Sequence, residues 1–157
     1  MTSYVGVCGS GTAGEEELAR AEEIGRLLAG AGAIVVCGGL GGVMDAVARG
    51  ASGAGGTAIG LLPGETRAGA SEHLTLALPT GLGEARNALV ARVSDVLIAV
   101  GGEWGTLSEI ALAMKMGKRV VGLESWVLSR GGGPVEGILE AGSPEEAVRL
   151  ALEHGPA

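Results

Sequence analysis

Residues 100–109 (VGGEWGTLSE) join the end of an apolar segment to the start of a helix-like one. Open α/β sheets bind their ligands at such strand-to-helix junctions. The glycines let backbone N–H groups approach a bound anion, and the positive end of the following helix faces the same point. Because a carboxylate, Glu109, lies one turn into that helix, the segment predicts a polar ligand with a reacting group beside it.

Two more glycine-rich segments follow apolar runs in the same way: residues 9–14 (GSGTAG) and residues 37–42 (CGGLGG). If the three loops lie at one sheet edge, their backbone N–H groups form a wall of donors suited to phosphate. Each glycine loop taken alone is also compatible with a tight turn or close packing. Together they predict one common cleft.

Residues 9–14 also fit G-x-G-x-x-G, the fingerprint of dinucleotide-binding enzymes. That fingerprint needs a carboxylate for the ribose about 20 residues later, and residues 36–39 (VCGG) supply none. Residues 15–17 are three glutamates, which crowd the place of a pyrophosphate but suit the positive end of a helix. We therefore favour a ligand other than NAD(P), and we expect no resident cofactor.

Arg86 lies on the apolar side of a predicted helix, since Leu89, Val90 and Val93 follow it at i+3, i+4 and i+7. A cation there needs a carboxylate or phosphate partner, because an unpaired buried charge is expensive. A site role and a structural ion pair are both open. Arg92 falls off this stripe, and we expect it to be solvated.

Glu109 has the same placement on its own helix, with Leu112, Ala113 and Met116 at i+3, i+4 and i+7. Residues 106–109 (TLSE) also form a capping-box pattern, in which the glutamate only accepts the N-cap N–H. Both readings stay open at this point. Trp104 could stack on a flat heterocycle, or it could serve packing or an interface.

The elements that carry these residues alternate between short aliphatic runs and stretches of helical length. This pattern predicts an α/β fold, an open parallel sheet with helices on both faces. The expected strands are 4–8, 33–36, 57–62, 74–78, 95–100 and 119–123, and the expected helices are 15–29, 42–52, 84–94, 106–116 and 144–153. Ser143, Pro144 and Glu146 form the start signal of the last helix. Residues 129–134 (SRGGGP) are expected to form a flexible loop.

Composition narrows the setting further. The 157 residues suit one domain, 1–157, and a net charge of −7 argues against a nucleic-acid partner. No basic-then-apolar leader or membrane-length apolar run is present, so we expect a cytoplasmic protein without membrane contact. Cys8, Cys37, His73 and His154 match no metal-ligand spacing, and we expect no metal.

Five groups of residues resemble the signature of the Lonely Guy family, long labelled lysine decarboxylases. They are Cys8-Gly9-Ser10; Gly38-Gly39 with Gly42-Val43-Met44; Gly83-Glu84-Ala85-Arg86-Asn87; Ala91-Arg92 with Asp95; and Gly102 with Gly105-Thr106 and Glu109. The resemblance implies a Rossmann-like fold, a homodimer or larger homo-oligomer, and cleavage of the N-glycosidic bond of nucleoside 5′-monophosphates, including cytokinin precursors. It makes Arg86 and Glu109 the catalytic pair. It assigns ligand binding to Gly9, Ser10, Gly38, Gly39, Gly42, Met44, Asn87, Gly102, Gly105 and Thr106.

The chain departs from the hydrolase pattern at four positions. Asn87 replaces a lysine, Glu84 a histidine, Gly101 a proline and Glu103 a glycine. The pattern more closely resembles a sister branch that includes molybdenum-cofactor carrier proteins. A carboxylate at position 103 is also expected to weaken phosphate binding.

The decarboxylase label fails on chemistry, because a pyridoxal enzyme needs a lysine for its Schiff base. Only Lys115 and Lys118 are available, both at a predicted helix end. We therefore expect a protein that binds a phosphorylated nucleotide or pterin at the carboxyl edge of the sheet. The alternative is a phosphoribohydrolase in which Glu109 stabilises the cationic sugar or positions water and Arg86 orients the phosphosugar. Turnover is left open.

Overall fold

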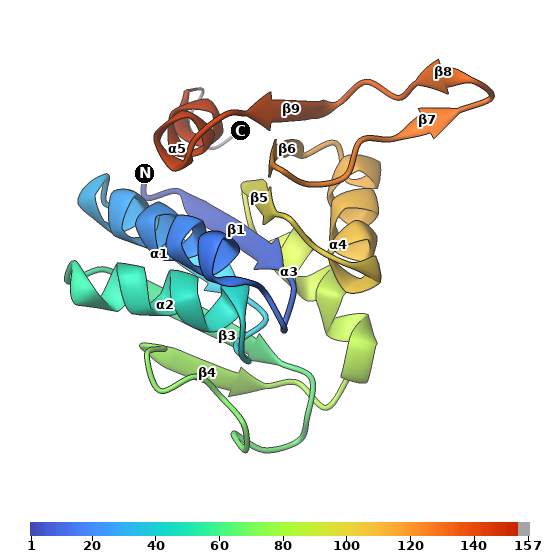
Figure 1. Cartoon of the computed structure of the whole chain (residues 1–157). Helices are drawn as coiled ribbons and strands as arrows, with labels where there is room; N and C mark the ends of the chain where they lie inside the picture. Colours follow the sequence, from blue (N-terminus) through green and yellow to red (C-terminus); the bar gives the residue numbers. More distant parts are fainter. Residues whose placement is uncertain (154–157) are drawn as a thin grey trace.

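The computed structural model describes residues 1–153. Its main sheet has seven strands in the order β4-β3-β2-β1-β5-β6-β9, and every neighbouring pair is parallel (Figure 1). The strands are β1 (Tyr4–Gly9), β2 (Ile34–Cys37), β3 (Thr57–Leu62), β4 (Leu76–Pro79), β5 (Val96–Val100), β6 (Arg119–Leu123) and β9 (Ile138–Ala141). The predicted α/β, Rossmann-like open parallel sheet is confirmed.

The central strands β1 and β5 are apolar because helices cover both of their faces. All five residues of β5 are buried, and Val5 of β1 pairs in register with Val35 of β2 on one side and Val96 of β5 on the other. The chain order reverses at the β1–β5 boundary. Doubly wound sheets open a crevice at such a switch point.

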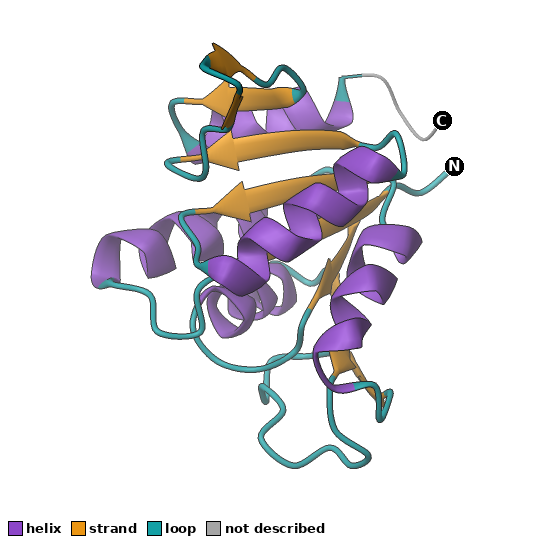
Figure 2. Cartoon of the chain, turned by 90° about the vertical axis from the view of Figure 1, so that its right-hand side faces the viewer, coloured by secondary structure: helices purple, strands orange, loops and turns teal. Residues whose placement is uncertain are grey.

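Helices α1 (Glu15–Gly30), α2 (Val43–Gly53) and α5 (Pro144–Leu152) cover one face of the sheet. The 3₁₀ helix η1 (Gly83–Arg86), α3 (Asn87–Val93) and α4 (Trp104–Lys115) cover the other, which faces the viewer in Figure 2. Each face has its own apolar core. Within residues 1–153, no helix is both long and apolar enough to span a bilayer.

Several elements differ from the sequence-based expectation. The helix expected from residue 84 divides at Arg86 into η1 and α3, and Val93 is 44% exposed rather than part of the buried stripe. The helix expected from Thr106 begins at Trp104, with Glu103 at its N-cap. The capping-box alternative for Glu109 is therefore wrong, because this residue lies in the second turn.

Residues 129–134, expected as a flexible loop, form an antiparallel hairpin of β7 (Ser129–Arg130) and β8 (Gly133–Pro134). Its turn residues Gly131 and Gly132 have φ of 60° and 82°, the left-handed region that tight hairpin turns require. Strand β9 was not predicted, since it is a short edge strand in which Leu139 and Glu140 are exposed. The start of α5 is as predicted, with the Glu146 N–H donating to Ser143 Oγ at 3.2 Å. His154, considered above as a metal ligand, lies outside the described residues.

Candidate functional site

A cleft of about 290 Å³ opens at the carboxyl ends of β1, β2 and β5, beside the switch point. All three glycine loops contribute to it, so the predicted convergence at one sheet edge is confirmed. The predicted site residues that line it are Gly9, Ser10, Gly38, Met44, Arg86, Asn87, Gly105, Thr106 and Glu109. Cys8, Gly11, Thr12 and Glu103 line it as well, although they were not among the predicted site residues.

The loop after β1 is tied to the start of α2. Ser10 accepts the N–H of Thr12 on its Oγ at 3.0 Å and the N–H of Val43 on its carbonyl at 3.0 Å. Gly42 has a φ of 64°, and a Cβ there would overlap the Ser10 carbonyl oxygen. Gly42 does not line the cleft. Its lack of a side chain lets the loop before α2 contact the loop after β1.

Gly39 and Gly102 do not line the cleft either, and each lies in a turn beside it. Both have positive φ, 77° and 111°. A Cβ on Gly39 would stand 2.8 Å from Leu62, and one on Gly102 would stand 2.5 Å from Thr106. Gly39, Gly42 and Gly102 are thus not among the residues that line the cleft, and their predicted part in ligand binding stays a prediction.

Arg86 is 9% exposed and ends η1 with its guanidinium in the cleft. Its Nη1 donates to the Leu61 carbonyl at 3.0 Å, whereas its buried Nε has no hydrogen-bond partner. A Cβ on Gly38 would overlap Nη1, so glycine at this position makes room for the guanidinium. Burial lowers the pKa of Arg86, and the nearby Glu109 opposes that shift.

The structural ion pair considered for Arg86 is not formed. Among residues 1–153, the ion pairs within 4.0 Å join other side chains, and none includes Arg86. Arg92 is exposed, as expected for a residue off the apolar stripe. Arg86 is consequently a buried cation whose Nη1 has a hydrogen-bond acceptor and whose Nε has none.

Glu109 projects into the same cleft from α4 and is 6% exposed. Burial raises its pKa to about 7, against the lowering effect of Arg86 and of a hydrogen bond with the Cys8 thiol. The pKa of Cys8 is in turn raised well above its usual value, first by burial and then by Glu109. Near neutral pH the Glu109 carboxyl is therefore present in both its protonated and its ionised form.

Asn87, which follows Arg86 and begins α3, connects that helix to α4, the helix that carries Glu109. Its Nδ2 donates to Ser108 Oγ at 3.0 Å, and that hydroxyl donates to the Gly105 carbonyl at 2.6 Å. This chain of bonds fixes α3 against the first turn of α4. Asn87 therefore positions the cleft wall in addition to lining it.

Glu103 is the cleft residue of greatest consequence that the sequence reasoning left out. The sequence marked it as a departure from the hydrolase pattern that is expected to weaken phosphate binding, and a carboxylate inside a glycine loop already signals proximity to the ligand. Its Oε1 accepts a long hydrogen bond of 3.5 Å from Ser10 Oγ. A negative charge therefore lies at the mouth of the cleft.

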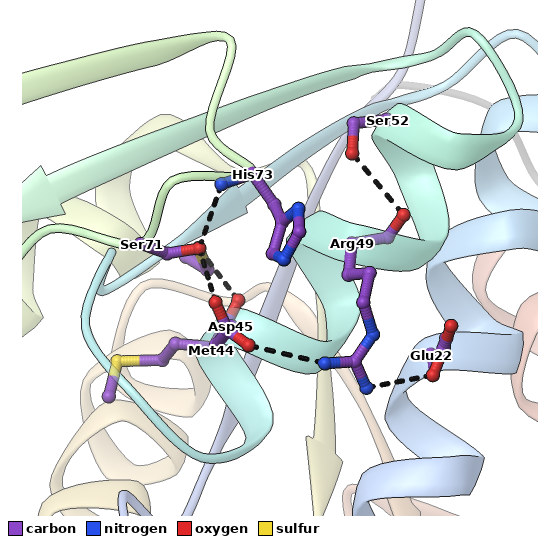
Figure 3. Close-up of polar contacts among 8 residues, drawn as sticks. Glu22, Met44, Asp45, Arg49, Ser52, Ser71 and His73 are labelled. Atoms are coloured by element: carbon purple, nitrogen blue, oxygen red, sulfur yellow. Dashed lines mark hydrogen bonds and ion pairs between the residues drawn. The ribbon is translucent and has the colours of Figure 1, made fainter.

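A polar network ties α2, the helix that carries the cleft residue Met44, to neighbouring segments (Figure 3). Ser71 Oγ donates to Asp45 Oδ1 at 2.6 Å, and Arg49 bridges Asp45 at 3.4 Å and Glu22 at 2.8 Å. The network joins α1, α2 and the loop between β3 and β4. The Met44 side chain extends away from it, which leaves Met44 free to line the cleft (Figure 3).

Residues 2–148 match the sequence pattern of the SLOG cluster4 family. The chain belongs to this family. An uncharacterized protein of Archaeoglobus fulgidus is 40% identical to this SLOG cluster4 protein over 148 residues, 94% of this chain and 93% of the relative.

Two solved structures are close in fold and sequence. The molybdenum cofactor binding protein of Rippkaea orientalis superposes with a TM-score of 0.86 at 33% identity, over 96% of this chain and 95% of that one. The molybdenum cofactor carrier protein of Chlamydomonas reinhardtii gives 0.85 at 35% identity, over 98% of both chains. The resemblance to the Lonely Guy superfamily, on the side of the molybdenum-cofactor carriers, is thereby confirmed.

Proposed function

We propose that this SLOG cluster4 protein binds a phosphorylated small molecule, a pterin or a nucleotide, in the cleft at the carboxyl edge of the sheet. The observation that carries the proposal is the buried Arg86 side chain, whose Nε lacks a partner. A phosphate oxygen satisfies such a donor and pairs with the charge at the same time. Relatives named for binding or carrying the molybdenum cofactor support a pterin-type ligand.

The rest of the cleft suits the same ligand. Gly11 in the loop after β1 and Gly105 in the first turn of α4 line the cleft without a side chain, which leaves backbone groups exposed there, and the N-terminus of α4 faces the cleft. The Glu109 carboxyl, with its pKa near 7, can donate or accept a hydrogen bond with the ligand. Glu103 counts against a second phosphate at the mouth, since it places like charges together.

The alternative is a nucleoside 5′-monophosphate phosphoribohydrolase, and one observation favours it. Arg86 and Glu109 line a single cleft, and within residues 1–153 neither forms an ion pair within 4.0 Å. In that reaction the ionised Glu109 stabilises the cationic sugar or positions water, while Arg86 orients the phosphosugar. Because only the ionised carboxylate acts, the rate should rise with pH through about 7.

Arg86→Ala tests the binding proposal, with Arg92→Ala, at an exposed arginine of the adjoining helix α3, as the control. Charged hydrogen bonds contribute about 1.5–3 kcal/mol, so calorimetry should show a loss of roughly 10- to 150-fold in affinity for a phosphorylated ligand. Affinity for its dephosphorylated form should change little, and Arg92→Ala should match wild type for both. Equal losses for the two forms would contradict a phosphate role for Arg86.

A screen of nucleoside 5′-monophosphates for released free base separates binding from turnover. Wild-type protein that binds a monophosphate through Arg86 and releases no base is a carrier. Base release that Glu109→Gln abolishes, with binding retained, would instead establish the hydrolase. The raised pKa of Glu109 gives a further check, since the hydrolase rate must fall below pH 7.

A further inference from the structure

Both tryptophans of the chain lie together at the carboxyl edge of the sheet. Trp104 is the first residue of α4, Trp126 follows β6, and their ring centroids are 5.3 Å apart with a tilt of 38°. The Trp126 indole N–H donates to the Glu103 carbonyl at 3.3 Å, and its ring packs partly buried against the core. Trp104 is 76% exposed. Trp126 thus supports a second indole that is open to solvent.

The segment that supports this pair is held at several points. Glu124 has a φ of 49°, a left-handed conformation that non-glycine residues seldom adopt, and its carboxylate pairs with Arg20 of α1. Ser125 Oγ donates to the Gly101 carbonyl at 2.6 Å. These contacts and the packing of Trp126 against the core fix Trp126, and through it Trp104, which itself belongs to neither apolar core. A surface indole held in this way indicates a binding role.

The position of Trp104 connects it to the cleft. Glu103 and Gly105, its neighbours in the chain, both line the cleft, and consecutive Cα atoms are only about 3.8 Å apart. The cleft holds about 290 Å³, at the lower limit of small-molecule pockets, which span roughly 300–1,000 Å³. A phosphate and the atoms linking it to a ring fill much of that volume, so the ring itself emerges at the mouth.

We propose that Trp104 is the stacking platform for the flat, bicyclic nitrogen heterocycle of the ligand, a pterin or a purine, whose phosphate lies in the cleft. The inference rests on the proposed function and extends its site beyond the cleft lining. Indole faces stack on such rings with little dependence on ring substituents. Trp104 therefore selects for a ring-bearing monophosphate over a bare sugar phosphate.

The test uses guanosine 5′-monophosphate and neopterin monophosphate as ring-bearing probes and ribose 5-phosphate as the ring-free probe. Trp104→Ala should weaken binding of the ring-bearing probes roughly 10- to 100-fold and leave ribose 5-phosphate unchanged. Trp104→Phe should restore most of that loss. Val127→Ala removes another exposed apolar side chain, 75% accessible, near the same edge and should match wild type.

Fluorescence gives an independent readout, because Trp126→Phe leaves Trp104 as the sole tryptophan. Ring-bearing probes should quench its emission, and saturating ribose 5-phosphate should not. Unchanged affinity of Trp104→Ala for both ring-bearing probes, or equal quenching by all three probes, would overturn the inference. So would a Trp104→Ala variant whose only change is a lower molar mass in light scattering, since a second copy would then cover the ring.

Failure of the proposed function gives a different pattern. In that case no phosphorylated probe, ribose 5-phosphate included, binds in a manner that depends on Arg86. Guanosine and neopterin without phosphate then test Trp104 alone: binding that Trp104→Ala abolishes supports the platform, and no binding overturns both proposals.

Discussion

The two faces of the sheet are covered differently, and only one of them supplies buried charged groups to the cleft. On the first face, α1 and α2 approach so closely that a Cβ on Gly25 or Gly50 would overlap the backbone of the other helix. On the second face, η1 carries Arg86 and α4 carries Glu109. Rigid packing on one side thus coexists with costly buried charges on the other, as expected when a binding site is built at the expense of stability.

The second face also leaves apolar side chains uncovered. Leu76 and Leu78 of β4 are 50% and 45% exposed, and Val93 of α3 is 44% exposed. The homo-oligomer implied by the family resemblance stays a prediction. Light scattering of variants in which these exposed apolar side chains are replaced by polar ones would test whether this face is the interface.

The largest expected effect lies on the first face. Gly50→Val places atoms against the Glu22 carbonyl, and we expect a loss of at least about 3 kcal/mol in the free energy of unfolding, measured by denaturant titration. Gly53→Ala, on the same helix with open space around it, should be neutral or slightly stabilising. Equal free energies of unfolding for the two variants would show that close packing of α1 against α2 does not set the first face apart from the second.

The second face should respond to pH through Glu109. Its folded pKa of about 7 lies above the ordinary value of 4.5, so the folded protein retains a proton that the unfolded chain loses. Stability contributed by this group is complete below pH 4.5 and falls as pH rises towards 7. At about 1.4 kcal/mol per pKa unit, Glu109→Gln should gain up to about 3 kcal/mol over wild type between pH 4.5 and 8. A pH-independent difference would contradict the raised pKa.

Gly38→Ala should displace the Arg86 guanidinium without harming the first face. We expect about a tenfold or greater loss of affinity for a phosphorylated ligand and a small change in stability, since the flexible Arg86 end can move. In an Arg86→Ala background the same change should have almost no further effect on binding. Additive losses would show that Gly38 acts on the ligand directly.

Arg86→Met should give the smallest change in the free energy of unfolding. The sign of that change shows whether the buried charge on the second face costs stability. Replacing a buried, incompletely bonded charge by an apolar side chain should leave the free energy of unfolding unchanged or raise it by about 1 kcal/mol, while phosphate binding is lost. Thermal and denaturant unfolding without ligand measure this. A clear destabilisation would mean that Arg86 is primarily structural.

Local patterns were sufficient for most of the architecture. Alternating aliphatic and helical stretches predicted the parallel sheet, and glycines after three of its strands predicted a shared edge, because parallel strands place their carboxyl ends together. Helical spacing also predicted that Arg86 and Glu109 lie at the cleft. Strand β9 and the hairpin at residues 129–134 were not predicted from the sequence, because short exposed segments have no periodic pattern of apolar residues.

Only the tertiary structure decided which side chains are buried and which groups they contact. Sequence spacing allowed Glu109 to be a capping residue, and the start of α4 at Trp104 excluded that role. The unsatisfied Arg86 Nε, the pKa of Glu109 near 7 and the support of Trp104 by Trp126 all depend on segments far apart in the chain. Residue types and local spacing determine which groups can do chemistry, whereas desolvation and contact are properties of the packed molecule and arise only when those segments meet.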